Sequence, residues 1–192
     1  MSMLCNLYAL TPAQIETIES RPEAVGELLG CEPPAKKVGI IAKLFGKAPV
    51  SPGRAGHRLE PIPESETFEL DKAWHILHFL FSGSAEEGPW PASFILSGGQ
   101  EVGPDLGYGS PRLLTPKDLS EIASFLQTLS LQGMAATYKA DAIRAAKVYW
   151  KPSESDDECQ RQVEDIWSIT QSLRDFVIHL AQSGRSALIH IY

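Results

Sequence analysis

The hydrophobic positions of this chain form strand-like runs near its two ends and helix-like stripes between them. Residues 3–10 are apolar and short, and residues 186–192 are rich in β-branched and apolar side chains, so both runs predict strands. The pairs Thr11-Pro12 and Thr115-Pro116 are typical of helix starts, because threonine caps a helix and proline fits its first turn. Apolar spacing then predicts helices over residues 12–20, 116–129, 140–147 and 154–183, and a second short helix after Arg21-Pro22 that runs to Leu29. Residues 92–96 are predicted as a short strand or extended segment.

A strand at each end of the chain, with helices between, predicts an α+β fold. We expect a small sheet that contains the N- and C-terminal strands and is packed with several helices. The length of 192 residues fits a single domain over residues 1–192. Residues 31–65 differ from the rest because proline and glycine recur there around a basic stretch, so they predict an insertion into that domain.

The segment over residues 69–83 carries the most concentrated set of titratable side chains. Its apolar residues predict one helix with a broad buried face, and Asp71, His75 and His78 follow one margin of that face. Imidazole and carboxylate groups can bind a divalent metal or move protons near neutral pH. The same residues can be structural, with Asp71 near the helix start and the histidines held in the core. The His-x-x-His spacing lacks the pair and the glutamate of zinc proteases, so we predict no metal and no cofactor.

Several motifs of the chain resemble one family. They are Leu-Asp-Lys-Ala-Trp-His-Ile-Leu-His-Phe-Leu before Ser82-Gly83, the turn Gly107-Tyr108-Gly109 before Leu-Leu-Thr-Pro, and the terminal Ala-Leu-Ile-His-Ile. Together they are similar to the YfbM-like family of uncharacterised bacterial proteins, over nearly the whole chain apart from residues 31–65. The resemblance implies a compact α+β bacterial protein of the cytosol. It implies no particular reaction, substrate or catalytic residue.

The glycine-rich stretch over residues 97–110 has two interpretations. It lacks the Gly-Lys-Ser/Thr ending and the Gly-x-Gly-x-x-Gly pattern of phosphate-binding loops, which favours a plain sharp turn with Tyr108 packed inward. The alternative is one wall of a ligand cleft, in which Asp105, Tyr108 and Arg112 face the central helix at Trp74.

Charge and composition exclude several classes of function. The net charge of −7 argues against nucleic-acid binding, which needs a basic surface. Tryptophans that stack on bases are therefore not expected, and we interpret Trp90, Trp150 and Trp167 as core or near-core aromatics. The three widely separated cysteines predict neither a disulfide framework nor a zinc site, and they favour a reducing, cytoplasmic location. No apolar run approaches about 20 residues and residues 1–10 lack a signal-peptide pattern, so no transmembrane segment is predicted.

The insertion contains one basic amphipathic stretch over residues 36–47. Lys36, Lys37, Lys43 and Lys47 surround apolar residues there, an arrangement that can lie on an anionic membrane surface. The alternative is a surface flap that packs its apolar side chains onto the domain.

These observations favour a cytosolic binding or interaction protein over an enzyme, because no complete catalytic set accompanies the fold. We predict that its partner is another protein. An immunity protein that occupies the active site of a basic toxin is one version of this hypothesis. The alternative is a small-molecule or metal-assisted enzyme centred on Asp71, His75 and His78.

Overall fold

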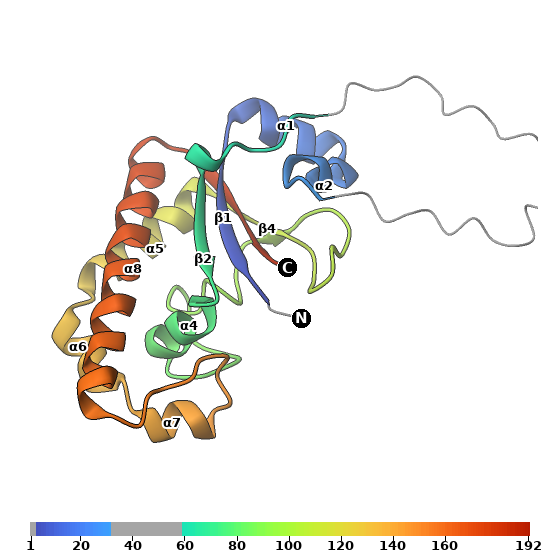
Figure 1. Ribbon diagram of the computed structural model, residues 1–192. Coiled ribbons are helices and arrows are strands. Elements are labelled where there is room, and N and C mark those ends of the chain that lie inside the picture. The colour runs from blue at the N-terminus through green and yellow to red at the C-terminus, as the bar shows by residue number, and fades with distance from the viewer. Residues whose placement is uncertain (1–2, 32–58) are drawn as a thin grey trace, which may run out of the picture.

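The computed structural model describes residues 3–31 and 59–192, and its strands form one antiparallel sheet (Figure 1). The strands are β1 (Cys5–Leu10), β2 (Thr67–Asp71), β3 (Gln100–Glu101), β4 (Arg112–Leu114) and β5 (Ser186–Ile191). They lie in the order β2-β1-β5-β4-β3, with antiparallel neighbours throughout. The predicted α+β fold is therefore confirmed, and its two terminal strands pair along their full length in the middle of the sheet.

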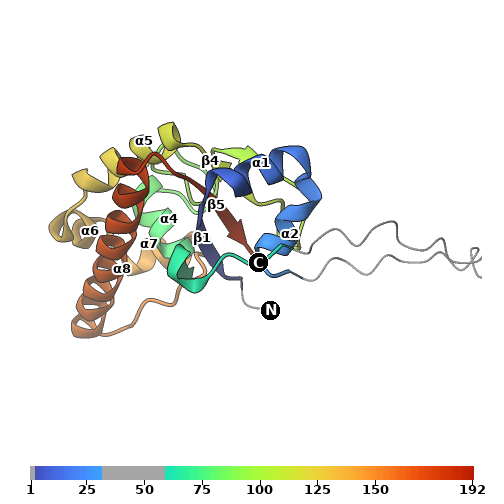
Figure 2. The ribbon, with the colours of Figure 1, turned by 90° about the horizontal axis from the view of Figure 1, so that it is seen from above.

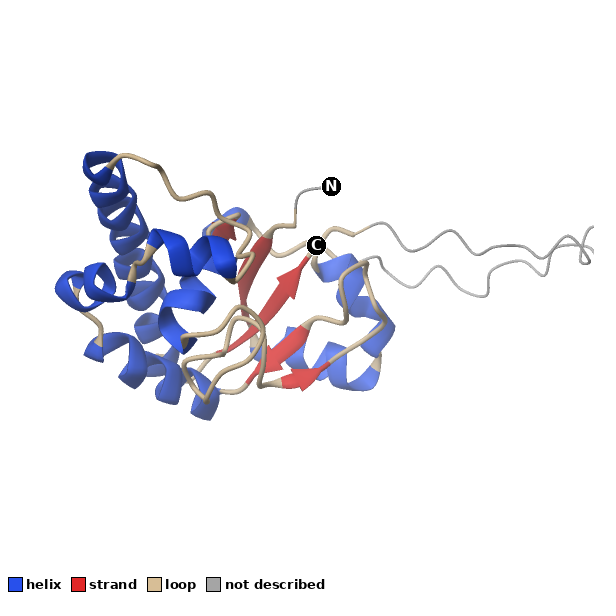
Figure 3. Ribbon diagram, turned by 90° about the horizontal axis from the view of Figure 1, so that it is seen from below, coloured by secondary structure: helices blue, strands red, loops and turns tan. Residues whose placement is uncertain are grey.

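Helices cover both faces of this sheet (Figures 2 and 3). The described helices are α1 (Pro12–Ser20), α2 (Val25–Leu28), α4 (Trp74–Ser82), α5 (Pro116–Thr128), α6 (Leu131–Thr137), α7 (Ala140–Ala145) and α8 (Asp156–Gln182), with short 3₁₀ turns at Pro22–Ala24 and Glu64–Glu66. The main core lies between the sheet and α4, α5 and α8, and a smaller core lies under α1 and α2. Alternation along β1 produces both, since Leu7 points into the main core and Leu10 into the smaller one.

The two predicted threonine caps are confirmed. The Thr11 hydroxyl accepts from the backbone of Gln14 at 3.3 Å, while the Gln14 side chain accepts from the backbone of Thr11 at 2.8 Å. Thr115 and Asp118 make the same exchange at 3.2 and 2.8 Å. Each pair satisfies two backbone donors that the first turn of a helix otherwise leaves unpaired. The starts of α1 and α5 are thus encoded locally.

The central segment is a strand followed by a helix, so the prediction of a single helix from residue 69 is wrong. β2 runs to Asp71, and α4 begins only at Trp74. Glu69 is exposed and Leu70 is buried, as expected for a strand with one covered face. Asp71 has a φ of 46°, a left-handed conformation that turns the chain out of the sheet. The helical spacing misled because Leu70 fits both the end of a strand and the start of an apolar stripe.

Residues 92–96 are also not the predicted strand. They form turns, in which the carbonyl of Ser93 accepts from the backbone of Leu96 at 3.0 Å and of Ser97 at 2.9 Å. Phe94 and Ile95 are fully buried, so the apolar run reflects burial in the core and not pairing in a sheet. Neither α6 nor the three-residue strand β4 was predicted, because neither is long enough to show a clear period.

Within the described ranges, no helix is both long and apolar enough to cross a membrane. The basic stretch over residues 36–47, with Lys36, Lys37, Lys43 and Lys47, lies outside the described residues.

Candidate functional site

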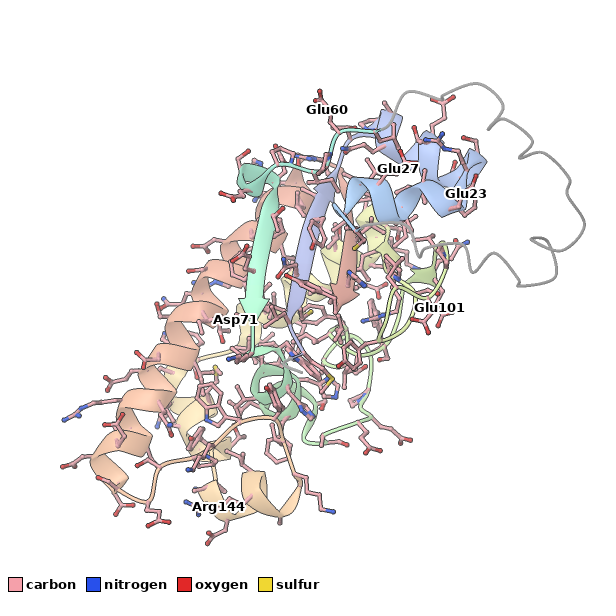
Figure 4. All side chains as sticks on the ribbon, turned by 45° about the vertical axis from the view of Figure 1, so that its right-hand side comes forward. Glu23, Glu27, Glu60, Asp71, Glu101 and Arg144 are labelled. Carbon is pink, nitrogen blue, oxygen red and sulfur yellow. The ribbon has the colours of Figure 1, made fainter. Side chains whose placement is uncertain are left out.

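Asp71, His75 and His78 do not form the predicted row. Asp71 lies exposed where β2 ends, as Figure 4 shows, whereas both histidines belong to α4. The carboxylate therefore does not share a helix margin with the imidazoles.

His75 ties two loops together. Its Nε2 lies 2.9 Å from the carbonyl oxygen of Ala85, and the backbone N–H of Tyr149 donates to its Nδ1 at 2.9 Å. Because the amide of Tyr149 can only donate, Nδ1 is unprotonated and Nε2 carries the hydrogen. The ring also stacks on Trp74, with 4.6 Å between the ring centroids, and the indole of Trp74 donates to the carbonyl of Met3. Both ring nitrogens of His75 are thus engaged by the backbone.

His78 is a core histidine. It is fully buried in α4, and its Nε2 lies 3.3 Å from the hydroxyl of Ser82. Burial, together with the smaller effect of the neighbouring His75, lowers the pKa of His78 to about 4. The imidazole is therefore neutral at pH 7.

The residues of the predicted cleft are only partly brought together. Tyr108 and Arg112 line a small cavity of about 180 Å³, together with Leu96, Glu101, Gly109, Ser110, Ile189 and Ile191. Trp74 and Asp105 are not among the residues that line it. The prediction that Tyr108 packs inward is wrong, because 47% of its surface is exposed.

Asp105 and Arg112 both hold loop backbone in place. The Asp105 carboxylate accepts from the backbone of Gly107 at 2.7 Å and of Gly109 at 3.0 Å, and these bonds lower the pKa of Asp105. The Arg112 guanidinium donates to three carbonyl oxygens, those of Gly98, Phe94 and Ile95, at 2.7, 3.2 and 2.5 Å respectively. Arg112 thus fastens the turns around residues 94–98 to β4. Within the described part of the chain, no group of three or more His, Cys, Asp or Glu side chains could hold a metal ion.

A hollow larger than this cavity lies elsewhere, along the outer side of α5. This α5 groove measures about 700 Å³ and is lined by Trp90, Pro91, Lys117, Ser120, Glu121, Ser124, Phe125 and Thr128. Trp90 is 36% exposed, so the prediction that it is a core or near-core aromatic is wrong. Aromatic and methylene groups dominate the lining.

The indole of Trp90 is fixed although it is exposed. Its Nε1 donates to the carboxylate of Glu121 on α5. The ring lies directly against Gly98, where an added Cβ would come within 2.2 Å of Trp90 Cζ3. On the floor of the groove, Phe125 packs edge-on against Phe81 of α4, with 5.7 Å between the ring centroids. Contacts from two other elements therefore hold Trp90 and Phe125 at the groove.

A family model described as a domain of unknown function (DUF1877) matches residues 1–190. The chain belongs to the DUF1877 family. A crystal structure of a protein of unknown function, YfbM from Escherichia coli, is similar to this DUF1877 chain, with a TM-score of 0.64 and 14% sequence identity. The match covers 98% of this chain and 99% of that one, and at this identity it shows the fold alone. The resemblance to the YfbM-like family that the motifs predict is confirmed, whereas no curated protein matches the chain.

Sequence reasoning missed the α5 groove of this DUF1877 protein. One usable signal was the tryptophan between two prolines, Pro89 and Pro91, since such a loop resists burial in a regular core. A second signal was the row of small polar residues Ser120, Ser124 and Thr128, which are four positions apart and therefore lie on one side of α5.

Proposed function

We propose that this protein acts by binding a basic segment of another protein in the α5 groove. The observation that carries the proposal is the exposed but fixed indole of Trp90 at the edge of an apolar hollow. Tryptophan is among the residues that contribute most to protein interfaces, because it buries a large apolar area with few rotatable bonds. Holding it in place beforehand lowers the entropy lost on binding.

Charge complementarity favours a basic partner. The chain carries a net charge of −7, and Glu86 and Glu87 lie in the loop that leads to Trp90. Inside the groove, the ammonium group of Lys117 lies 3.9 Å from the carboxylate of Glu121. The positive charge of Lys117 is therefore partly balanced and repels a basic partner less. A second copy of this chain would bring another −7 to the contact, which argues against self-association. Lysine or arginine beside an apolar anchor is the chemistry that fits.

The state of the former catalytic candidates agrees with a binding role. Both ring nitrogens of His75 are engaged by backbone groups, and His78 is buried. We place the protein in the cytoplasm, because Cys5, Cys31 and Cys159 are all free thiols, as is usual in a reducing compartment. A basic toxin covered by its immunity protein is one member of the class of partners that this proposal admits.

The proposal is tested by photo-crosslinking inside the cells that make the protein. A benzophenone amino acid replaces Ser124 in the α5 groove, and the crosslinked peptide is sequenced. Ser20 on α1 is the matched control position, because both serines are exposed and both donate to the carbonyl four residues earlier at 2.8 Å. We expect position 124 to capture one segment in which lysine or arginine flanks an apolar residue.

Two further outcomes decide the test. The Trp90→Ala variant should lose this crosslink, whereas Tyr108→Ala, which removes an exposed aromatic from a different loop, should keep it. The proposal is wrong if position 124 captures nothing beyond what position 20 captures. It is also wrong if the captured segment is acidic, or if its capture survives Trp90→Ala.

A further inference from the structure

The α5 groove has a neighbour on the other side of the same helix. This second hollow, the α8 hollow, measures about 250 Å³ and is lined by Ser120, Ala123, Ser124, Gln127, Ile178, Ala181 and Gln182. Ser120 and Ser124 line both hollows, so these two side chains belong to the ridge between them. The helices α5 and α8 lie side by side in Figures 1 and 2, and together they form the walls.

The ridge between the two hollows is low, and its two serine hydroxyls already have hydrogen-bond partners. The hydroxyl of Ser120 donates to the carbonyl of Pro116 at 2.8 Å, and that of Ser124 donates to the carbonyl of Ser120 at 2.8 Å. Each hydroxyl donates to a carbonyl of its own helix, so a bound segment does not need to supply an acceptor for it. Short side chains at a crossing point allow two helices to approach closely.

We infer that the segment bound here is an α-helix that crosses α5 and places one apolar side chain in each hollow. This inference rests on the proposed function and adds the form of the partner. The backbone groups of α5 and α8 are already paired within their helices, so an extended segment would find few partners for its own N–H and C=O groups. A helix satisfies its backbone internally and presents only side chains.

The geometry also sets the spacing of the anchors. A helix is about 10 Å across, and a rise of about 1.5 Å per residue makes seven residues span that width. Two apolar residues seven positions apart therefore straddle the ridge at Ser120 and Ser124, one beside Trp90 and the other beside Ala181. The basic character of the helix follows from the net charge of −7 and from Glu86 and Glu87 in the loop before Trp90. The expected motif is a basic amphipathic helix with two anchors.

The test compares two displayed peptide libraries of equal length, selected against the full chain. One is built from helix-forming residues, and the other has two central prolines that exclude a helix. We expect binders from the helical library alone, positively charged and with apolar residues seven apart. Fluorescence anisotropy of a labelled synthetic winner should show affinity about thirtyfold weaker for Trp90→Ala and for Ala181→Lys. Ser20→Lys, on the opposite face of the sheet, should leave the affinity unchanged.

The outcomes separate this inference from the proposed function. If both libraries yield binders that depend on Trp90 but not on Ala181, the partner is not a helix across α5, and the proposed function stands. If neither library yields a binder that depends on Trp90, both fail. Gln182→Lys, at an exposed position of the α8 hollow, replaces Ala181→Lys if circular dichroism shows that the latter is unfolded.

Discussion

Acid should destabilise this protein through two buried histidines, His78 and His190. His190 lies in β5 with 3% of its surface exposed, and neither of its ring nitrogens has a hydrogen-bond partner among the described residues. Burial lowers the pKa of His190 to about 4, with Asp105 opposing the shift, and burial lowers that of His78 to about 4 as well. As the pH falls, these two histidines take up a proton near pH 6.5 in the unfolded chain but only near pH 4 in the folded chain. Stability is therefore complete above pH 6.5 and is lost as the pH falls toward 4.

The size of the effect follows from the two pKa values. A drop from 6.5 to about 4 corresponds to about 3 kcal/mol for each histidine once the pH is below both values. At pH 5 the loss is about 2 kcal/mol for each, or about 4 kcal/mol for His78 and His190 together. Since small domains are stable by about 5–15 kcal/mol, this loss is a large part of the total.

Urea unfolding followed by circular dichroism at pH 7.5, 6 and 5 measures this loss. We expect His190→Phe to lose about 2 kcal/mol less than the original chain between pH 7.5 and pH 5. At pH 7.5 the variant should be no less stable, because phenylalanine removes two buried nitrogens that have no described partner. His179→Gln, which replaces an exposed histidine of α8, controls for the removal of a histidine as such. An equal loss for His190→Phe and the original chain would refute the reasoning.

Substitutions at three further positions test the turns and the helix cap near the α5 groove. Gly98→Ala should cost about 1–2 kcal/mol and shift the tryptophan fluorescence, since the new Cβ meets Trp90 at 2.2 Å and φ is +79°; unchanged emission would mean that the indole is not held by Gly98. Arg112→Met should lower the free energy of unfolding in urea by about 2–3 kcal/mol, because three carbonyls lose their donor. Arg112→Lys should recover only part of this loss, and full recovery would contradict the three-way contact. Thr115→Ala should cost about 1 kcal/mol in thermal unfolding, whereas Thr115→Ser should cost little.

Much of the fold could be predicted wherever the signal is local. The caps at Thr11 and Thr115 depend on residues three positions apart, so the sequence displays them directly. The stripe of α8 is long enough to reveal its period, and Val163, Ile166 and Thr170 along this stripe are all buried. Elements whose form depends on distant partners were not predictable in this way. β4 has only three residues and exists because β3 and β5 flank it.

The candidate site was less predictable, because burial and exposure there depend on tertiary contacts. Helical spacing placed Asp71 beside His75 and His78, but pairing of β2 with β1 removes Asp71 from that helix. The flanking prolines mark Trp90 as a loop residue, but its fixed position depends on Gly98 and on Glu121 of another element, which the sequence does not place beside it. A sequence pattern reports neighbours along the chain, and this groove is made of neighbours in space.

The pairing of the two terminal strands governs when the protein can fold. Asn6 and Tyr192, whose side chains are hydrogen-bonded, are 186 positions apart, and β1 lies against β5 from end to end. During synthesis, β1 is made before β5, so its central partner does not exist until the helices between the two strands have been made. The apolar strand Cys5–Leu10 is unpaired with β5 for that whole interval, which makes formation of the sheet a late and slow event.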